Sequence, residues 1–324
     1  MEYLPDFKVV RPATVQQAVT AYAAHADARY IAGGTDLMVN VRRGIVAPQT
    51  LIDIGGVAEI TAIDAQQNGG VRIGAGVTLN ELAAHGLIAK EYPAIAEAAR
   101  QVAAPTHRQV ATVGGNLCLD TRCLYYNQSE WWRVSNNYCL KNKGEVCHVA
   151  PSGSRCFAAF SGDLAPALMV FDAEVEISGP NGVRAVPLSE MYNDDGAAHL
   201  KLEKGEMLTA VIIKSGDGWR SGYAKARVRG SIDFPLAGVA IALKRQGDQL
   251  SDIRVAFTGT NSYPVMLKKT EGLLQGPFDV DALVALLPKQ ITPMPSTFYP
   301  PGYRRKVAAN LTRTLARRLF EAAV

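Results

Sequence analysis

The sequence lacks several features that would assign it to a class at once. No apolar run approaches the roughly 18 residues that a membrane-spanning helix requires. The N-terminus carries an acidic second residue and no apolar segment of a secretory signal, so we expect a cytoplasmic protein without a membrane partner. An excess of one charge is also missing. The 34 Lys and Arg against 30 Asp and Glu give +4, too little to indicate a nucleic-acid partner.

Cysteine is scarce as well, but it is unevenly distributed. All five Cys of the 324 residues lie between positions 118 and 156. An extracellular domain held by disulfides would be smaller and denser in Cys. The closely paired Cys that are typical of structural zinc sites are absent. The concentration of thiols in one segment therefore predicts a metal or redox site.

The pattern of elements predicts two domains with an α+β fold. Hydrophobic residues make up 48% of the chain and charged residues 20%, which is enough for more than one core. Short strands alternating with helices over residues 1–55 indicate a small parallel β-α-β unit. A larger mixed or antiparallel part is expected over 56–216. A smaller α+β domain is expected over 217–324.

Particular elements follow from local signals. A continuous apolar run predicts a strand over 167–177. Val307, Leu311, Leu315 and Leu319 fall on one face of a predicted helix over 303–324, whose basic residues, Arg304 among them, are expected in solvent. Residues 118–160 show no period and predict a long loop, in which Trp131 and Trp132 are interpreted as packing residues.

Two Gly-Gly turns have the chemistry of a phosphate site. Gly33 and Gly34 follow a strand and precede Thr35, Asp36 and a helix; the second turn runs from Thr112 to Asn116. Glycine allows a ligand to approach the backbone closely, and free N–H groups bind anions. Either turn alone could be an ordinary connection. Two such turns, each with a Thr and a short polar side chain, suit a ligand with two phosphates.

The spacing of four thiols favours a cluster over a single ion. Cys123, Cys139, Cys147 and Cys156 are separated by 16, 8 and 9 positions. Widely spaced single thiolates can surround an iron–sulfur cube. Five basic residues against two acidic ones between 121 and 156 give a local charge of +3, which would offset an anionic cluster. Buried thiols without a ligand and a zinc site are the alternatives.

These motifs together resemble the FAD-binding medium subunit of the xanthine oxidase/CO dehydrogenase family of molybdenum enzymes. The two Gly-Gly turns are similar to that family's FAD-pyrophosphate turns. Asp163-Leu164-Ala165-Pro166 is similar to its third landmark, and Gly222 to Arg227 to the segment that opens its C-terminal domain. The resemblance implies a two-part FAD-binding domain of the CO dehydrogenase/vanillyl-alcohol-oxidase type. The implied FAD-binding residues are Ile31, Ala32, Gly33, Gly34, Thr35, Asp36, Leu37, Thr112, Gly114, Gly115, Asn116, Asp163 and Lys225.

The chain departs from this family pattern in one place. Asn116 and Asp163 are 47 positions apart, much further than in ordinary members, so residues from about 119 to 158 form an insertion. A Cys-bearing insertion here resembles the 4-hydroxybenzoyl-CoA reductase branch, where it holds an additional [4Fe–4S] cluster. The implied ligands are Cys123, Cys139, Cys147 and Cys156, with Cys118 as an alternative to Cys123.

The resemblance implies an electron-transfer subunit that binds FAD and [4Fe–4S] and has no catalytic residue of its own. Molybdopterin and [2Fe–2S] centres would lie in a large and a small partner subunit, in a dimer of heterotrimers. Ferredoxin would donate electrons for the reductive dehydroxylation of an aromatic thioester in anaerobic aromatic degradation. A flavin subunit of another molybdenum hydroxylase and a zinc-stabilised interaction subunit without redox function are the alternatives.

Overall fold

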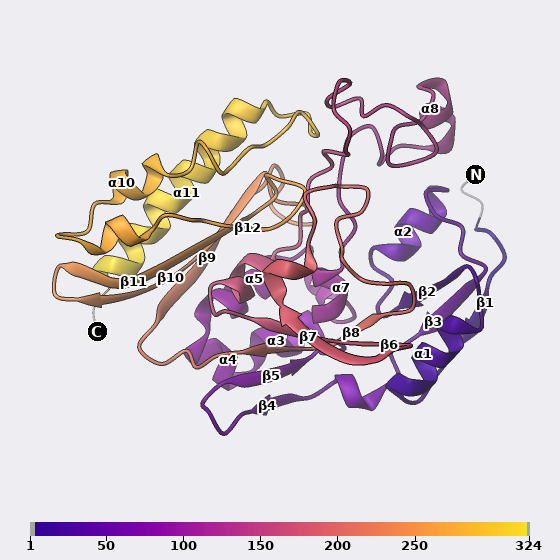
Figure 1. Cartoon of the computed structure of the whole chain (residues 1–324), viewed down its shortest axis with the longest axis horizontal. Helices are drawn as coiled ribbons and strands as arrows, with labels where there is room; N and C mark the ends of the chain where they lie inside the picture. Colours follow the sequence, from indigo (N-terminus) through magenta and orange to yellow (C-terminus); the bar gives the residue numbers. More distant parts are fainter. Residues whose placement is uncertain (1–3, 323–324) are drawn as a thin grey trace.

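The computed structural model describes residues 4–322 and contains three separate sheets. Figure 1 shows the N-terminal sheet at one end, the C-terminal sheet with its long helix at the other, and the largest sheet below and between them. In the described part of the chain, no helix combines the length and apolarity needed to cross a membrane.

The N-terminal sheet has three parallel strands in the order β1-β3-β2, which confirms the predicted parallel unit. The hydroxyl of Thr14 accepts a hydrogen bond from the Gln17 N–H and begins the first crossover helix. The second helix follows the first Gly-Gly turn. The elements are β1 (Lys8–Val10), α1 (Val15–Ala23), β2 (Ala28–Ile31), α2 (Leu37–Arg42) and β3 (Thr50–Asp53).

The central sheet has five antiparallel strands in the order β4-β5-β8-β6-β7. Helices pack on it to form the main hydrophobic core. A capping box formed by Thr78 and Glu81, two residues of the type that this motif requires, begins one of these helices. The elements are η1 (Ala58–Ile60), β4 (Ile63–Ala65), β5 (Val71–Gly74), α3 (Leu79–Ala84), α4 (Gly86–Glu91), α5 (Pro93–Gln101), α6 (Pro105–Arg108), α7 (Val113–Leu117), α9 (Leu164–Met169), β6 (Glu174–Gly179), β7 (Gly182–Pro187), η2 (Leu188–Met191) and β8 (Met207–Ile213).

The C-terminal sheet has four antiparallel strands in the order β12-β11-β10-β9. The long helix α11 contacts β9 and β10, and α5 of the central part also contacts β9. Strand β9 therefore joins the two parts of the molecule. The elements are β9 (Arg220–Ala226), β10 (Ala237–Gln246), β11 (Gln249–Thr258), β12 (Val265–Met266), η3 (Glu271–Leu274), α10 (Val280–Ala285) and α11 (Pro301–Glu321).

The prediction of a strand over 167–177 is wrong. Helix α9 (Leu164–Met169) occupies the first part of this run, and β6 begins only at Glu174. Every residue of α9 is buried, so its sequence has no polar face to reveal the helical period. A short, fully apolar run cannot be assigned to helix or strand by periodicity alone.

The prediction that Arg304 lies in solvent is also wrong. Its side chain is completely buried at the start of α11, whereas the other end of the predicted helix, residues 323–324, lies outside the described residues. The guanidinium donates to the carbonyls of Leu236 (3.2 Å), Met294 (3.0 Å) and Gly259. A buried arginine is tolerated here because backbone carbonyls of three segments accept its protons.

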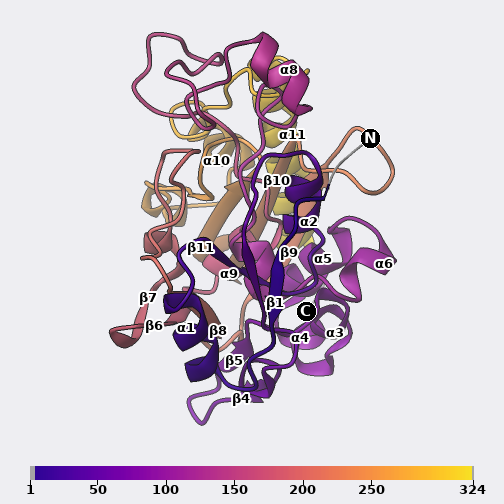
Figure 2. The same ribbon diagram turned by 90° about the vertical axis from the view of Figure 1, so that its right-hand side faces the viewer.

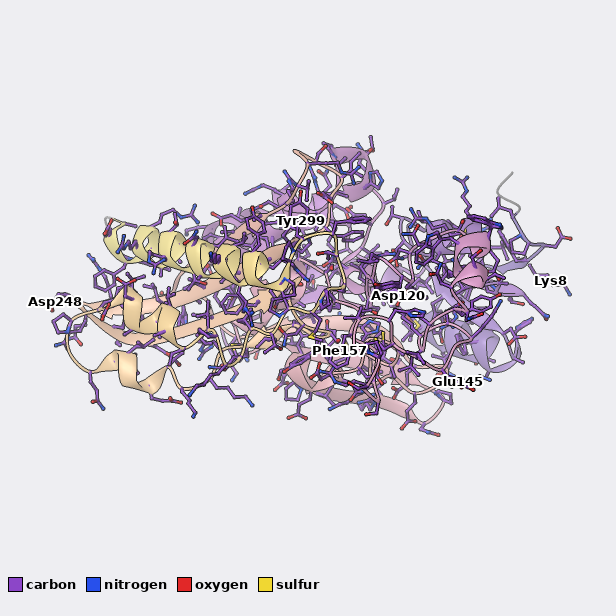
Figure 3. The ribbon with its side chains drawn as sticks, turned by 90° about the horizontal axis from the view of Figure 1, so that it is seen from above. Lys8, Asp120, Glu145, Phe157, Asp248 and Tyr299 are labelled. Carbon is purple, nitrogen blue, oxygen red and sulfur yellow. The ribbon has the colours of Figure 1, made fainter. Side chains whose placement is uncertain are left out.

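The insertion stands above the other elements in Figures 1 and 2, and it contains one short helix, α8 (Glu130–Ser135), where only a loop was predicted. The Ser129 hydroxyl caps that helix by accepting from the Trp132 N–H. Seen from above in Figure 3, Asp120, Glu145 and Phe157 lie between Lys8 of the N-terminal sheet and Asp248 of the C-terminal sheet. The interpretation of Trp131 as a packing residue is wrong, because 77% of its surface is exposed.

Candidate functional site: two glycine turns and a thiol pocket

The two Gly-Gly turns lie against each other. A Cβ atom on Gly33 would stand 2.0 Å from the carbonyl oxygen of Val110, just before the second turn, so only glycine fits there. Gly34 has a φ of +68°, and a Cβ on Gly114 would press on Ala75 at 2.9 Å. The structure therefore brings together the two motifs that the sequence placed about 80 residues apart.

The first turn has several unused backbone donors. No residue among 4–322 accepts a hydrogen bond from the N–H groups of Gly33, Gly34, Thr35 or Asp36. Ile31 and Ala32 lead from β2 into this turn, and Leu37 begins α2. Successive backbone N–H groups without a protein acceptor are the kind of donors that bind phosphates.

The second turn is a rigid support. The Gly114 N–H donates to the Ala75 carbonyl at 2.8 Å, and the Gly115 N–H donates to the Thr112 hydroxyl at 3.1 Å. The Asn116 amide oxygen accepts from the Leu164 N–H at 3.0 Å, which fixes the third landmark beside the second turn. All three segments predicted to bind FAD therefore meet in one region.

Asp163 and Lys225 form a buried ion pair. The Lys225 ammonium lies 3.0 Å from one Asp163 carboxylate oxygen, and the Tyr223 hydroxyl donates to the other at 2.6 Å. Lys225 also donates to the Gln101 carbonyl at 3.1 Å. Asp163 makes no helix-capping bond, so its carboxylate serves this pair instead. The pair joins the start of α9 to β9.

Electrostatics at the pair follow from its burial. Burial raises the pKa of Asp163, while the Lys225 ammonium and the Tyr223 hydroxyl act in the opposite direction. Burial and the Asp163 charge together raise the pKa of Tyr223. Sequence reasoning missed Tyr223, although alternation along a strand places residues 223 and 225 on the same face.

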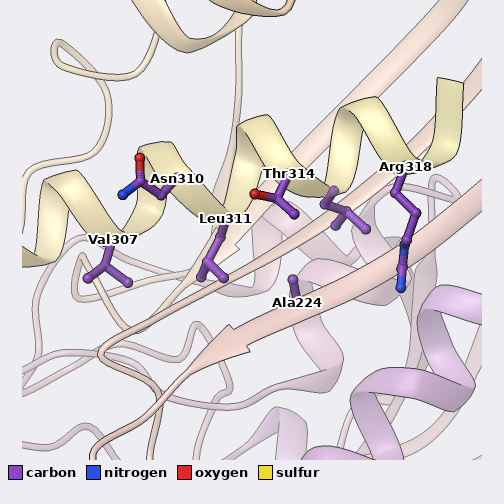
Figure 4. A pocket seen from close by; sticks show the side chains of 7 residues that line it. Ala224, Val307, Asn310, Leu311, Thr314 and Arg318 are labelled. Carbon is purple, nitrogen blue, oxygen red and sulfur yellow. The ribbon is translucent and has the colours of Figure 1, made fainter. Parts of the chain in front are cut away.

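A groove of about 300 Å³ lies on the opposite face of β9 and is separate from this pair. Figure 4 shows its wall, in which Ala224 faces Val307, Leu311 and Arg318 of α11. Because Ala224 alternates with Tyr223 and Lys225, the groove and the buried ion pair lie on opposite sides of the strand.

Four of the five cysteines gather in one buried pocket within the insertion. Cys123, Cys139, Cys147 and Cys156 share a hydrophobic cluster with Ile45 and other residues, and all are free thiols. We refer to these four residues as the thiol pocket. Cys118 packs instead against the main core. The four cysteines that were proposed as ligands from the sequence thus lie together in the structure, and Cys118 lies outside their cluster.

The thiols of the pocket interact with one another. Cys123 interacts electrostatically with Cys139 and Cys147, and Cys156 with Cys123 and Cys147. Burial raises the pKa of Cys123 to about 11 and of Cys156 to about 12. Within residues 4–322, no three His, Cys, Asp or Glu side chains are arranged to hold one metal ion. Metal binding would release protons from these thiols.

The basic residues of the insertion mostly point inward. The side chains of Arg122, Arg133 and Lys141 are 14%, 0% and 6% exposed, and each pairs with a carboxylate. Lys143 and Arg155 are more exposed. Most of the basic side chains behind the charge of +3 therefore lie inside the insertion and do not form a basic surface. The Lys141 ammonium acts against the burial of Cys156 and lowers the pKa of that thiol.

One ion pair links the segment of the thiol pocket to the first Gly-Gly turn. Arg122, next to Cys123, forms an ion pair with Asp36 of that turn. On another side, the Leu124 N–H donates to the Ser296 carbonyl at 2.9 Å, and Met294 packs against the pocket. Burial lowers the pKa of Arg122 to about 10. Sequence reasoning had not singled out Arg122, because a lone arginine carries no local signal.

Comparison with known proteins gives the class to which this arrangement belongs. Residues 5–213 match the family described as FAD binding domain in molybdopterin dehydrogenase, and residues 221–319 match the CO dehydrogenase flavoprotein C-terminal domain. The chain belongs to this family of FAD-binding subunits of molybdenum enzymes, of the xanthine and CO dehydrogenase type. It therefore binds FAD and is a subunit of an oxidoreductase.

Individual relatives agree with this membership. The aldehyde oxidoreductase FAD-binding subunit PaoB of Escherichia coli is 32% identical over 256 residues, which cover 76% of this chain and 79% of the relative. The carbon monoxide dehydrogenase medium chain of Hydrogenophaga pseudoflava is 27% identical over 273 residues, covering 83% and 79%.

Solved structures share the fold over nearly the whole chain. Carbon monoxide dehydrogenase from Hydrogenophaga pseudoflava superposes with a TM-score of 0.79 at 22% identity, covering 98% of both chains. Quinoline 2-oxidoreductase from Pseudomonas putida 86 gives a TM-score of 0.78 at 21% identity, again covering 98% of both chains. The predicted fold class, an FAD-binding part followed by a CO-dehydrogenase-type C-terminal domain, is confirmed.

Proposed function

We propose that the chain is the FAD- and [4Fe–4S]-binding electron-transfer subunit of a molybdenum-containing 4-hydroxybenzoyl-CoA reductase. The complex would convert 4-hydroxybenzoyl-CoA, two electrons and two protons into benzoyl-CoA and water. In this proposal the chain itself binds no thioester. It passes electrons from a low-potential ferredoxin through the cluster and the flavin to its partner subunits.

One observation carries the proposal: four free thiols share a buried cluster, and Arg122, next to Cys123, forms an ion pair with Asp36 of the first Gly-Gly turn. Each thiolate of a [4Fe–4S] cluster binds a different iron, so four Cys from separate segments suit such a group. The buried Lys141 ammonium, which acts on the Cys156 thiol, would offset part of its negative charge. Placing both redox groups on one chain, close together, would serve electron transfer between them.

The chain's residues would hold the flavin at three places. The free N–H groups of Gly33, Gly34, Thr35 and Asp36 would bind the diphosphate, and the second turn would support them. Asp163 and Lys225 would contact the nucleotide and the ring system. Bound FAD would supply the electron-exchange chemistry, while the protein positions it and tunes its electrostatics.

The partners follow from the same proposal. Relatives of this chain are described as medium chains of carbon monoxide dehydrogenases. We therefore propose a large subunit with molybdopterin and a small subunit with [2Fe–2S] centres, assembled as a dimer of heterotrimers. The division between the two domains near residue 216 and a cytoplasmic location are part of this proposal.

A second candidate is the flavin subunit of a molybdenum hydroxylase that acts on another substrate. It is favoured by the 32% identity to an aldehyde oxidoreductase subunit. In that case electrons would leave the complex through this chain, and the substrate would be oxidised. The zinc-stabilised subunit without redox function conflicts with family membership, since FAD binding belongs to the family.

The two candidates are separated by the direction of electron flow in the purified complex. The complex would be reduced with dithionite under anaerobic conditions and then mixed with 4-hydroxybenzoyl-CoA while flavin absorbance is followed. We expect the flavin to be reoxidised and benzoyl-CoA to form. Reduction of the oxidised complex by an aldehyde or a purine, without any reaction of the reduced complex with the thioester, would contradict the proposal.

A further inference from the structure

Arg122 lies where the insertion meets the first Gly-Gly turn. Its guanidinium forms an ion pair with Asp36 and donates to the Asn40 amide oxygen at 3.4 Å. It also lies 4.7 Å from the centre of the Phe234 ring, a geometry that favours a cation. Three residues from two segments therefore fix one guanidinium beside the turn that carries the free N–H groups.

One donor of this guanidinium is unused. The Arg122 Nε–H is buried and has no acceptor within residues 4–322. A buried N–H without a partner is costly, and such groups in native structures call for a partner that the chain does not supply. The Asp36 carboxylate also needs a partner of opposite charge. It makes no capping bond to α2, and its negative charge lies beside N–H groups that would bind an anion.

We propose that Arg122 is a diphosphate-binding residue that the insertion contributes to the flavin site. The guanidinium neutralises Asp36 and directs its remaining donor to a phosphate oxygen held at the first turn. Arginine suits this task because its fixed array of donors can serve a carboxylate and a phosphate at the same time. Because Cys123 follows directly, flavin binding and the shape of the thiol pocket are coupled through one residue.

The inference rests on the proposed position of the diphosphate, and ADP is the probe that isolates this part of FAD. The complex would be freed of flavin and titrated with ADP by calorimetry, using wild type, Arg122→Gln, Asp36→Asn and the double variant. Arg155→Gln is the matched control, because Arg155 lies in the same insertion and pairs with Asp194 at its surface.

We expect Arg122→Gln to weaken ADP binding at least about tenfold, as for the loss of a charge-assisted hydrogen bond, and Arg155→Gln to leave it unchanged. The double variant should bind ADP about tenfold more weakly than Asp36→Asn alone. This comparison remains valid if Arg122→Gln alone folds poorly, because the double variant has no unpaired carboxylate.

Equal ADP affinities of Asp36→Asn and the double variant would overturn the role of Arg122, because Arg122 would then act only by neutralising Asp36. A wild-type complex that binds FAD but not ADP would overturn the proposed position of the diphosphate as well. The two failures are therefore distinguishable.

Discussion

At the scale of single residues, the proposed flavin site depends on groups that only one residue type can supply. Gly33 is the clearest case, because its missing side chain allows the first turn to touch the backbone at Val110. The buried pair of Asp163 and Lys225 is another, since each charge requires the other. The sequence pattern singled out Gly33, Asp163 and Lys225 as candidates, whereas Tyr223 and Arg122 became visible only from the fold.

A Gly33→Ala change should separate the two turns. Its new methyl group would overlap the Val110 carbonyl, so the backbone must shift and the free N–H groups lose their alignment. We expect FAD affinity to fall at least about tenfold while the chain remains folded. Flavin fluorescence titration measures this effect. Gly86→Ala is the control, because no atom lies within 4 Å of the added Cβ there; equal affinities of the two variants would argue against the close approach.

His199 should make stability depend on pH. Burial and the nearby Lys141 ammonium lower the pKa of His199 to about 4, and its Nε2 lies 2.9 Å from the Leu119 carbonyl oxygen. A lowered pKa means that the folded state binds fewer protons than the unfolded state. Its stabilising contribution, about 3 kcal/mol, is therefore full above pH 6.5 and is lost as the pH falls to about 4.

Urea unfolding of the wild type and of His199→Gln between pH 4 and 7 measures this contribution. The variant should lose less stability on acidification, and His25→Gln, at a site near α1, should behave as wild type. Parallel pH profiles for wild type and His199→Gln would exclude this role of His199.

At the scale of elements, the insertion behaves as a small folded unit attached to the flavin domain. Its helix α8 is anchored by Arg133, whose buried guanidinium donates to the carbonyls of Arg43 (3.1 Å), Gly44 (3.0 Å) and Gln128. Residues 43 and 44 follow α2, so this arginine fastens the insertion to the C-terminal end of that helix.

Replacing Arg133 with Met should loosen this attachment. The three carbonyls would lose their donor in a buried place, at a cost of about 2 kcal/mol or more. We expect faster hydrogen exchange across α8 and the end of α2, measured by mass spectrometry, and unchanged exchange in the C-terminal sheet. Lys143→Met is the control, because Lys143 contacts the same Glu130 from the exposed surface. Unchanged exchange at α8 in Arg133→Met would show that other contacts hold the insertion.

Some elements could be predicted from the sequence, and others could not, for physical reasons. Alternating short strands and helices indicated the parallel unit, and Thr78 with Glu81 marked a helix start. Helix α9 was mistaken for a strand because it is buried on all sides. The inward direction of Arg133 and Lys141 was equally hidden, since charge counts do not tell which side chains face the interior.

At the scale of the whole molecule, the redox groups would sit where the three sheets approach one another. Strand β9 carries Lys225 to Asp163 across the two parts of the chain, and the segment at Met294 covers the thiol pocket from the C-terminal side. Arg304 ties that segment to α11 and to the turn at Gly259. The site is assembled from segments that are far apart in the sequence. Each motif alone therefore indicated FAD binding only weakly, whereas the motifs together indicated it clearly.

The [4Fe–4S] cluster proposed for the thiol pocket is tested by the iron, sulfide, zinc and FAD content of the complex purified without oxygen, compared before and after Cys139→Ser and Cys118→Ser. After subtraction of the partner subunits' own centres, we predict about one FAD, four iron and four sulfide per chain. Cys139→Ser should lose this iron and keep its FAD, and Cys118→Ser should keep both. FAD without iron in this chain, or zinc in the thiol pocket, would contradict the account.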